Sequence, residues 1–288
     1  MNRCFKSVIF FIPGWGFKGS IFELAPSDCG TPHLLRPIFL SSGDNCEVLH
    51  DGEQQGLGSK GLPILYPKGC AWEISIEAYV ETLLGLRRSG KKIHLMGWSL
   101  GAILALKIAH LAQQGLRSHG HAPSLTPCSL ESLWLISLRR GFPSKEIGNM
   151  KAAVERDKRL GLRLFYRDCF KGQESLYRRF KDGLERNYIE SFTKKELLEG
   201  LDFLENNPVE EISVPEGLRT TLVHGTLDRI APIEDIPKVT SRVKYMFVEG
   251  CGHLPFLCKD VLTQIMQLAS LPKMRGAKGE DVLRYFEP

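Results

Sequence analysis

The chain has 288 residues, of which 43% are hydrophobic and 25% charged, and a formal net charge of +5. This composition excludes a disordered or fibrous protein, and no apolar run approaches the roughly 18 residues of a membrane-spanning helix. Domains of the α/β class often reach about 250 residues, so the length fits one core domain with an insertion.

The first element is a predicted buried strand over Val8–Ile12, which ends at the turn Pro13-Gly14-Trp15-Gly16. A charged start before this apolar run is also typical of a secretory signal. The run is too short for one, however, and no small-residue cleavage site follows it. We therefore expect a cytoplasmic protein that does not bind membranes.

The cysteines support the same compartment. No CxxC pair or zinc spacing is present, and a disulfide framework is rare in a long chain without an export signal. Free thiols are the expected state of all eight cysteines: Cys4, Cys29, Cys46, Cys70, Cys128, Cys169, Cys251 and Cys258.

Residues 25–70 are rich in Gly, Ser, Pro and Asp, and they predict long loops around strands at Pro37–Leu40 and Leu62–Tyr66. A clearer pattern follows: an apolar strand over Ile93–Met96, the pentapeptide Gly97-Trp98-Ser99-Leu100-Gly101, and a helix over Ala102–Gln113. A G-x-S-x-G turn between strand and helix exposes a nucleophilic serine above a sheet. Ser99 is therefore the candidate nucleophile.

Three further apolar runs predict strands at Leu133–Leu138, Thr221–His224 and Tyr245–Val248. Strands alternating with helices indicate a mainly parallel sheet flanked by helices. The long helical stretch after the first of these runs predicts an inserted cap, because connections in compact domains are usually short. We expect residues 1–138 and 207–288 to form the core, with its C-terminal tail, and residues 139–206 to form the cap.

Two polar side chains follow the last two predicted strands. Asp228 lies in the loop His224–Pro232, and His253 lies between glycines after Phe247–Val248. Each residue alone is equally typical of a solvated loop. The chain order Ser, Asp, His after three strands is that of the α/β-hydrolase triad, and strand ends are where this fold places its ligands. We interpret Ser99, His253 and Asp228 as nucleophile, base and orienting acid.

Other residues that could do this chemistry fit less well. Cys251 lies close to His253, but it lacks an elbow context and is interpreted as a small hydrophobic residue. His94 and His110 are predicted to be structural. An oxyanion needs two backbone N–H donors, for which Leu100 and Trp15 are the candidates. This mechanism requires neither a metal nor an organic cofactor.

The chain resembles the α/β-hydrolases related to the pimeloyl-acyl-carrier-protein methyl ester esterase of biotin synthesis. The resemblance rests on Pro13–Gly16, Leu95–Gly101, Leu197–Leu204, the Asp228 loop and Gly252–Phe256. It implies an α/β-hydrolase fold with an inserted helical cap, hydrolysis of a carrier-linked methyl ester, and substrate contacts at Trp15, Leu100 and Phe165. The family's usual Asp-x-Pro-Gly-x-Gly-x-Ser turn is absent, with only Asp51–Ser59 as a possible remnant.

Charge in the predicted cap gives a separate indication of a partner. Residues 151–195 contain thirteen lysines and arginines against seven acids, so their net charge exceeds that of the whole chain. Helical spacing predicts one positive stripe from Arg156, Arg159, Arg163 and Arg167. Such a stripe suits acyl carrier protein, which is acidic, although a solvated helix face has the same pattern.

Three functions remain open at this stage. The first is the carrier-linked methyl ester hydrolase, and the second is a broad short-chain carboxylesterase or thioesterase. The third is a non-catalytic α/β-hydrolase-fold binding protein, which the complete Ser-Asp-His set disfavours. A nucleic-acid partner is not expected, because no aromatic and basic recognition motif is present.

Overall fold

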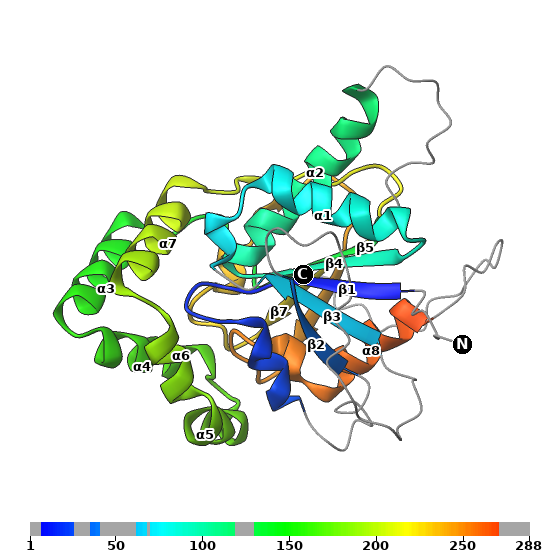
Figure 1. Cartoon of the computed structure of the whole chain (residues 1–288). Coiled ribbons are helices and arrows are strands. Elements are labelled where there is room, and N and C mark those ends of the chain that lie inside the picture. Colours follow the sequence, from blue (N-terminus) through cyan, green and yellow to red (C-terminus); the bar gives the residue numbers. More distant parts are fainter. Residues whose placement is uncertain (1–6, 26–34, 41–61, 68–69, 119–129, 271–288) are drawn as a thin grey trace.

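The computed structural model describes residues 7–25, 35–40, 62–67, 70–118 and 130–270 (Figure 1). In these residues seven strands form one sheet in the order β2-β3-β1-β4-β5-β7-β9, and every pairing is parallel. The predicted mainly parallel sheet is confirmed. The strands are β1 (Ser7–Ile12), β2 (Leu35–Leu40), β3 (Leu62–Pro67), β4 (Lys92–Trp98), β5 (Leu130–Ile136), β7 (Thr220–Gly225) and β9 (Lys244–Val248).

The centre of this sheet is apolar on both faces because helices cover both. Strands β1 and β4 are buried along almost their whole length. Helices α1 and α2 lie on one side of the sheet and α8 on the other (Figure 1). These helices span Ile76–Arg88, Leu100–Ser118 and Lys259–Ser270, and the short strands β6 (Glu211–Ile212) and β8 (Lys238–Val239) pair separately.

Strand β5 ends two residues earlier than its apolar pattern predicts. Its last residue is Ile136, and Ser137 follows with a φ of +49°. An L-residue in the left-handed region cannot continue a strand, so the chain turns here. The turn matters for the site, because Ser137 stays buried while Arg139 points into a polar cluster.

Five helices lie between β5 and β6 and form a helical insert beside the sheet (Figure 1). The insert packs on the loop after β1 through aromatic rings; Phe17 contacts Phe165, Tyr166, Phe180 and Tyr188 with centroids 5.0 to 5.9 Å apart. The helices are α3 (Ser144–Arg156), α4 (Lys158–Cys169), α5 (Glu174–Gly183), α6 (Glu185–Ser191) and α7 (Lys194–Asn206).

The prediction of one arginine stripe on a single helix is wrong at its first residue. Asp157 adopts an extended conformation, and its side chain caps α4 by accepting from the Leu160 N–H at 3.0 Å. Arg156 therefore ends α3, whereas Arg159, Arg163 and Arg167 lie on α4. An aspartate N-cap stabilises a new helix start by about 1 kcal/mol, which explains the break inside a continuous helical pattern.

Across the described ranges, no helix combines the length and hydropathy needed to cross a membrane.

Candidate active site

Ser99 lies on the tight turn between β4 and α2. Its φ is +55°, a strained conformation for a serine, and its N–H donates to the Ile136 carbonyl at 2.8 Å. A side chain at Gly101 would collide with the Ile12 carbonyl oxygen, so glycine is required for the helix to start against β1. Such strain is stored where the surrounding structure enforces it, as at the serine of a nucleophile elbow.

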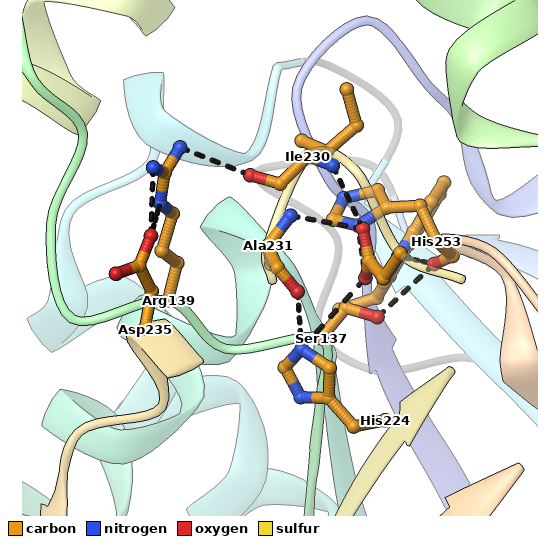
Figure 2. Close-up of polar contacts among 9 residues, drawn as sticks. Ser137, Arg139, His224, Ile230, Ala231, Asp235 and His253 are labelled. Carbon is orange, nitrogen blue, oxygen red and sulfur yellow. Dashed lines mark hydrogen bonds and ion pairs between the residues drawn. The ribbon is translucent and has the colours of Figure 1, made fainter. Parts of the chain in front are cut away.

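Asp228 and His253 form a buried pair at the ends of β7 and β9. The His253 Nδ1 lies 2.8 and 3.0 Å from the two Asp228 carboxylate oxygens. The same carboxylate accepts the N–H groups of Ile230 and Ala231, each at 2.9 Å (Figure 2). Burial by itself would raise the pKa of Asp228, but His253 and these hydrogen bonds outweigh it and hold the pKa below its usual value.

The structure brings this pair to the Ser99 elbow. The His253 ring packs against Trp98, the residue before Ser99, with centroids 5.5 Å apart. Its Nε2 is buried and has no hydrogen-bond partner within the described residues, the Ser99 hydroxyl included. The bond between a nucleophile and its base is often long until substrate binds. His253 thus has one nitrogen fixed by a carboxylate and one available as a base.

A clamp on the His253 backbone was not anticipated from the sequence. Its carbonyl oxygen accepts the Trp98 indole Nε1–H at 2.6 Å and the Ser137 hydroxyl at 3.3 Å (Figure 2). The Ser137 N–H in turn donates to the Val223 carbonyl at 2.8 Å. The ends of β4, β5 and β7 therefore fix the loop that carries His253.

We predict that Trp98→Phe lowers kcat about tenfold with little change in KM. The ring remains to fill the core, but the buried His253 carbonyl loses its shorter hydrogen bond, and such a bond contributes about 1 kcal/mol. Steady-state kinetics on a small ester measures both constants. A rise in KM at unchanged kcat would show that Trp98 shapes the pocket instead of holding the histidine.

Arg139 fixes the loop that carries Asp228. Its guanidinium is 6% exposed and donates to Asp235 at 2.9 Å and to the Ile230 carbonyl at 3.2 Å (Figure 2). It also pairs with Glu146 of α3 at 2.6 Å. One buried arginine thus joins the end of β5, the acid loop and the helical insert.

The other described histidines are structural, as predicted for His94 and His110. His94 bonds the Ser132 hydroxyl at 2.8 Å, and burial lowers its pKa to about 4. His110 lies 2.8 Å from the Leu106 carbonyl within α2. His224 is fully buried and contacts the Ala231 carbonyl, and burial lowers its pKa too. His224 thus helps to fix the loop that carries Asp228.

A pocket of about 100 Å³, partly open to solvent, lies beside Ser99. Trp15 and Phe165, two of the expected substrate contacts, line it and meet edge to face with centroids 4.8 Å apart. The Leu100 side chain does not line it and is fully buried in the core. The remaining lining residues are Phe142, Glu146, Ile147, Met150, Leu201, Leu204, Arg229 and Ile230.

The two backbone groups expected to bind an oxyanion belong to segments next to Ser99. Leu100 is the first residue of α2, where a helix leaves its N–H groups unpaired. The turn holding Trp15 sits over the serine, since a Cβ at Gly14 would be 3.0 Å from the Ser99 Cβ. The Trp15 indole donates to the Leu197 carbonyl of α7 at 2.8 Å, which anchors this turn to the insert.

The described cysteines and a group of potential metal ligands lie outside the pocket. Cys70, Cys169, Cys251 and Cys258 are free thiols, and Cys251 is buried against Cys258 as a small side chain. Within the described residues, Cys70, Glu73 and Glu196 have metal-ligand spacing, but none lines the pocket, and Glu196 already caps α7.

Some sequence predictions lie outside the described residues. These are the Asp51–Ser59 segment, the tail after residue 270, and the remaining cysteines. Sequence reasoning also missed Ser137, Arg139, Glu146 and Arg229 at the site. A serine and an arginine just after a strand have no distinguishing pattern, whereas Arg229 could have been found by its position next to Asp228.

The sequence profile of the Alpha/beta hydrolase family matches residues 9–264, which is most of the chain. The protein belongs to this family. It is also 25% identical over 267 residues to the pimeloyl-[acyl-carrier protein] methyl ester esterase of Wigglesworthia glossinidia brevipalpis, covering 88% of this chain and 89% of the relative.

Solved structures agree on the fold. An esterase from Exiguobacterium antarcticum superposes with a TM-score of 0.52 at 15% identity, over 91% of this chain and 92% of that one. The enol-lactonase from Burkholderia xenovorans LB400 superposes with a TM-score of 0.55 at 12% identity, over 93% and 91%. At these identities the likeness establishes the fold alone.

Proposed function

We propose that the protein is a serine carboxylic ester hydrolase with Ser99 as nucleophile, His253 as base and Asp228 as its orienting acid. The observation that carries this proposal is the buried His253–Asp228 pair held against a strained serine elbow beside an apolar pocket. A hydroxyl needs both an adjacent base and a group that orients the base before it attacks an ester.

The reaction follows from these positions. His253 Nε2 takes the Ser99 proton as the oxygen attacks the ester carbonyl, and the backbone N–H groups of Trp15 and Leu100 stabilise the oxyanion. The imidazolium then protonates the departing alcohol, which leaves an acyl enzyme on Ser99. Water, activated by the same histidine, releases the acid and restores the serine. Asp228 stays ionised and stabilises the imidazolium through Nδ1–H.

The proposed substrate is a methyl ester on an acyl chain carried by acyl carrier protein, as in biotin synthesis. Support comes from the relative named above, whose name describes this reaction. The pocket is consistent with an acyl chain, because Trp15, Phe165 and Leu201 give it an apolar wall. Free thiols at the described cysteines support a reducing compartment such as the cytoplasm.

Helix α4 offers a surface for an acidic partner. Leu160 and Leu164 are 48% and 41% exposed, unusually high for leucines on a helix. Arg167 lies three residues after Leu164, at the spacing of neighbours on one helix face, and Arg159 is on the same helix. An exposed apolar strip beside a row of cations suits a helix of mixed acidic and apolar character. The insert would thus act as a cap that also receives the carrier.

Arg163 is a poor probe of this surface because it has a structural partner. Its guanidinium lies 3.1 Å from the carboxylate of Glu185, which is only 4% exposed. Reversing Arg163 to Glu would place a half-exposed carboxylate against the buried carboxylate of Glu185, which would destabilise the packing of α4 on α6. Loss of activity in that variant would report misfolding of the insert.

We expect Arg159→Glu with Arg167→Glu to lower kcat/KM for a carrier-protein substrate about tenfold or more at low salt. Rim charges act mainly on the association rate, so the defect should shrink toward 1 M salt, where the screening length is about 3 Å. A small p-nitrophenyl ester, which has no acidic surface, should be hydrolysed normally.

The exposed pair Arg178 and Arg179 on α5 provides the control, since the same reversals there keep the change in net charge but lie off α4. An equal loss in both double variants would mean that net charge alone matters. No loss in either would favour the broad short-chain carboxylesterase or thioesterase.

A further inference from the structure

The pocket beside Ser99 is apolar except for the serine and two charged side chains, Glu146 and Arg229. Glu146 is already compensated, because its carboxylate lies 2.6 Å from the buried Arg139 guanidinium. Asp235 also pairs with the Arg139 guanidinium, and it lies 3.9 Å from the Arg140 guanidinium. This cluster of two arginines and two acids is electrically neutral.

Arg229 has no such compensation. No ion pair or hydrogen bond joins its side chain to any described residue, although it directly follows the buried Asp228. Asp228 turns inward to His253, and Arg229 lies on the pocket side of the same loop. Arg229, an exposed residue, therefore gives the wall of the pocket that Ser99 also lines a positive charge without an ion-pair partner among the described residues.

We propose that Arg229 binds a negatively charged group on the substrate and selects esters whose far end is anionic. This inference rests on the proposed ester hydrolysis and specifies its substrate class. Two sources supply the same chemistry: a carboxylate at the end of the acyl chain, as in a half ester of a dicarboxylic acid, or a phosphate on the arm that links chain to carrier.

The chemistry of arginine suits this role. Its guanidinium stays charged at all relevant pH values and can donate two parallel N–H bonds to a carboxylate or phosphate. Arg229 is an exposed residue, so water screens part of this attraction, but its neighbours Phe142, Ile147 and Ile230 are apolar and the pocket lining contains no second cation. A neutral chain end would leave the guanidinium without an anionic partner, so we expect the pocket to discriminate between substrates by charge.

The test compares Arg229→Met with the parent on matched p-nitrophenyl esters of equal chain length, one ending in a carboxylate and one in a methyl group. We expect Arg229→Met to lower kcat/KM about tenfold or more for the carboxylate ester alone, since hydrogen bonds to charged groups are stronger than neutral ones. Arg229→Lys should keep part of the preference. Arg242→Met, an exposed arginine outside the pocket, should have no effect.

A second pair of substrates separates the two anion sources. Methyl-ester acyl chains on pantetheine with and without its phosphate should differ through Arg229 only if the phosphate reaches the pocket. If Arg229→Met affects neither the carboxylate nor the phosphate substrate, or lowers the neutral esters equally, the inference is wrong.

Binding measured by calorimetry keeps the test independent of turnover. In Ser99→Ala protein, the half ester of a dicarboxylic acid should bind about tenfold more weakly after Arg229→Met. Unchanged affinity would overturn the inference even if esters are hydrolysed. If the parent protein hydrolyses no ester but Arg229→Met still weakens binding of the half ester, the proposed function is overturned and the anion site is retained.

Discussion

Ser99→Ala is expected to lower kcat for ester hydrolysis by about 10⁵-fold or more, leaving only the contribution of the oxyanion donors and the pocket. No other described serine has this combination of a strained turn, the His253–Asp228 pair and an adjoining pocket. Single-turnover measurements with a p-nitrophenyl ester extend the range low enough to detect the residual rate.

Ser137→Ala is a matched control for that experiment. Both serines are buried and both have a φ in the left-handed region, +55° for Ser99 and +49° for Ser137. Alanine meets the same backbone strain at either site, so the two variants should have similar stability. Ser137 contributes one long hydrogen bond to the His253 carbonyl, for which we expect about a tenfold loss or less.

Adding His253→Ala to Ser99→Ala should lower kcat little further, because the three side chains act as a unit. Equal losses in Ser99→Ala and Ser137→Ala would remove Ser99 from the mechanism.

Asp228→Asn is expected to lower kcat about 10⁴-fold while the protein remains folded. The amide is nearly the same size as the carboxylate, but it can present its N–H₂ to Nδ1 and hold the imidazole in the wrong tautomer. It also carries no charge to stabilise the imidazolium. The pH profile of kcat and a thermal unfolding curve measure the two effects separately.

Asp235→Asn provides the comparison, because Asp235 follows in the same loop and pairs with Arg139 instead of His253. We expect a loss of activity below about tenfold there, since the loop keeps the Arg139 bond to the Ile230 carbonyl. Similar losses in both variants would mean that Asp228 holds the loop and does not orient the base.

The lowered pKa of Asp228 fixes the sign of its pH dependence. A carboxyl with a folded pKa below its ordinary value contributes stability above the ordinary value of about 3.9. That contribution is lost as the pH falls through the folded pKa. Asp228 is therefore charged throughout the range in which activity is measured, and protonation of this residue does not produce the acid limb of the profile.

Features that depend on residues close together in the sequence could be predicted. The elbow around Ser99 needs only a strand, two glycines and a helix, and parallel strands bring Asp228 and His253 to the same edge of the sheet. The boundaries of β1, β4, β7 and β9 were predicted within two residues. The first three are buried strands and therefore nearly continuous apolar runs, whereas β9 is largely exposed and was predicted from the apolar residues Tyr245–Val248 alone.

Features that depend on distant contacts could not be predicted. Glu185 pairs with Arg163 and is buried because α4 packs on α6. No local pattern of charges indicates this packing. The Arg139 cluster joins residues up to 96 positions apart. Even a local feature can escape prediction. Asp157 caps α4 and separates it from α3, but the helical spacing of the arginines continues across both helices and hides the break.

The most direct test of the account is labelling with a fluorophosphonate, which reacts with activated serines, followed by mapping of the modified peptide by mass spectrometry. We predict stoichiometric labelling at Ser99 in the parent, strong slowing in Asp228→Asn, and none at this position in Ser99→Ala. Labelling of a different serine, or ester hydrolysis by a protein that the probe does not modify, would contradict the assignment of Ser99 as the nucleophile.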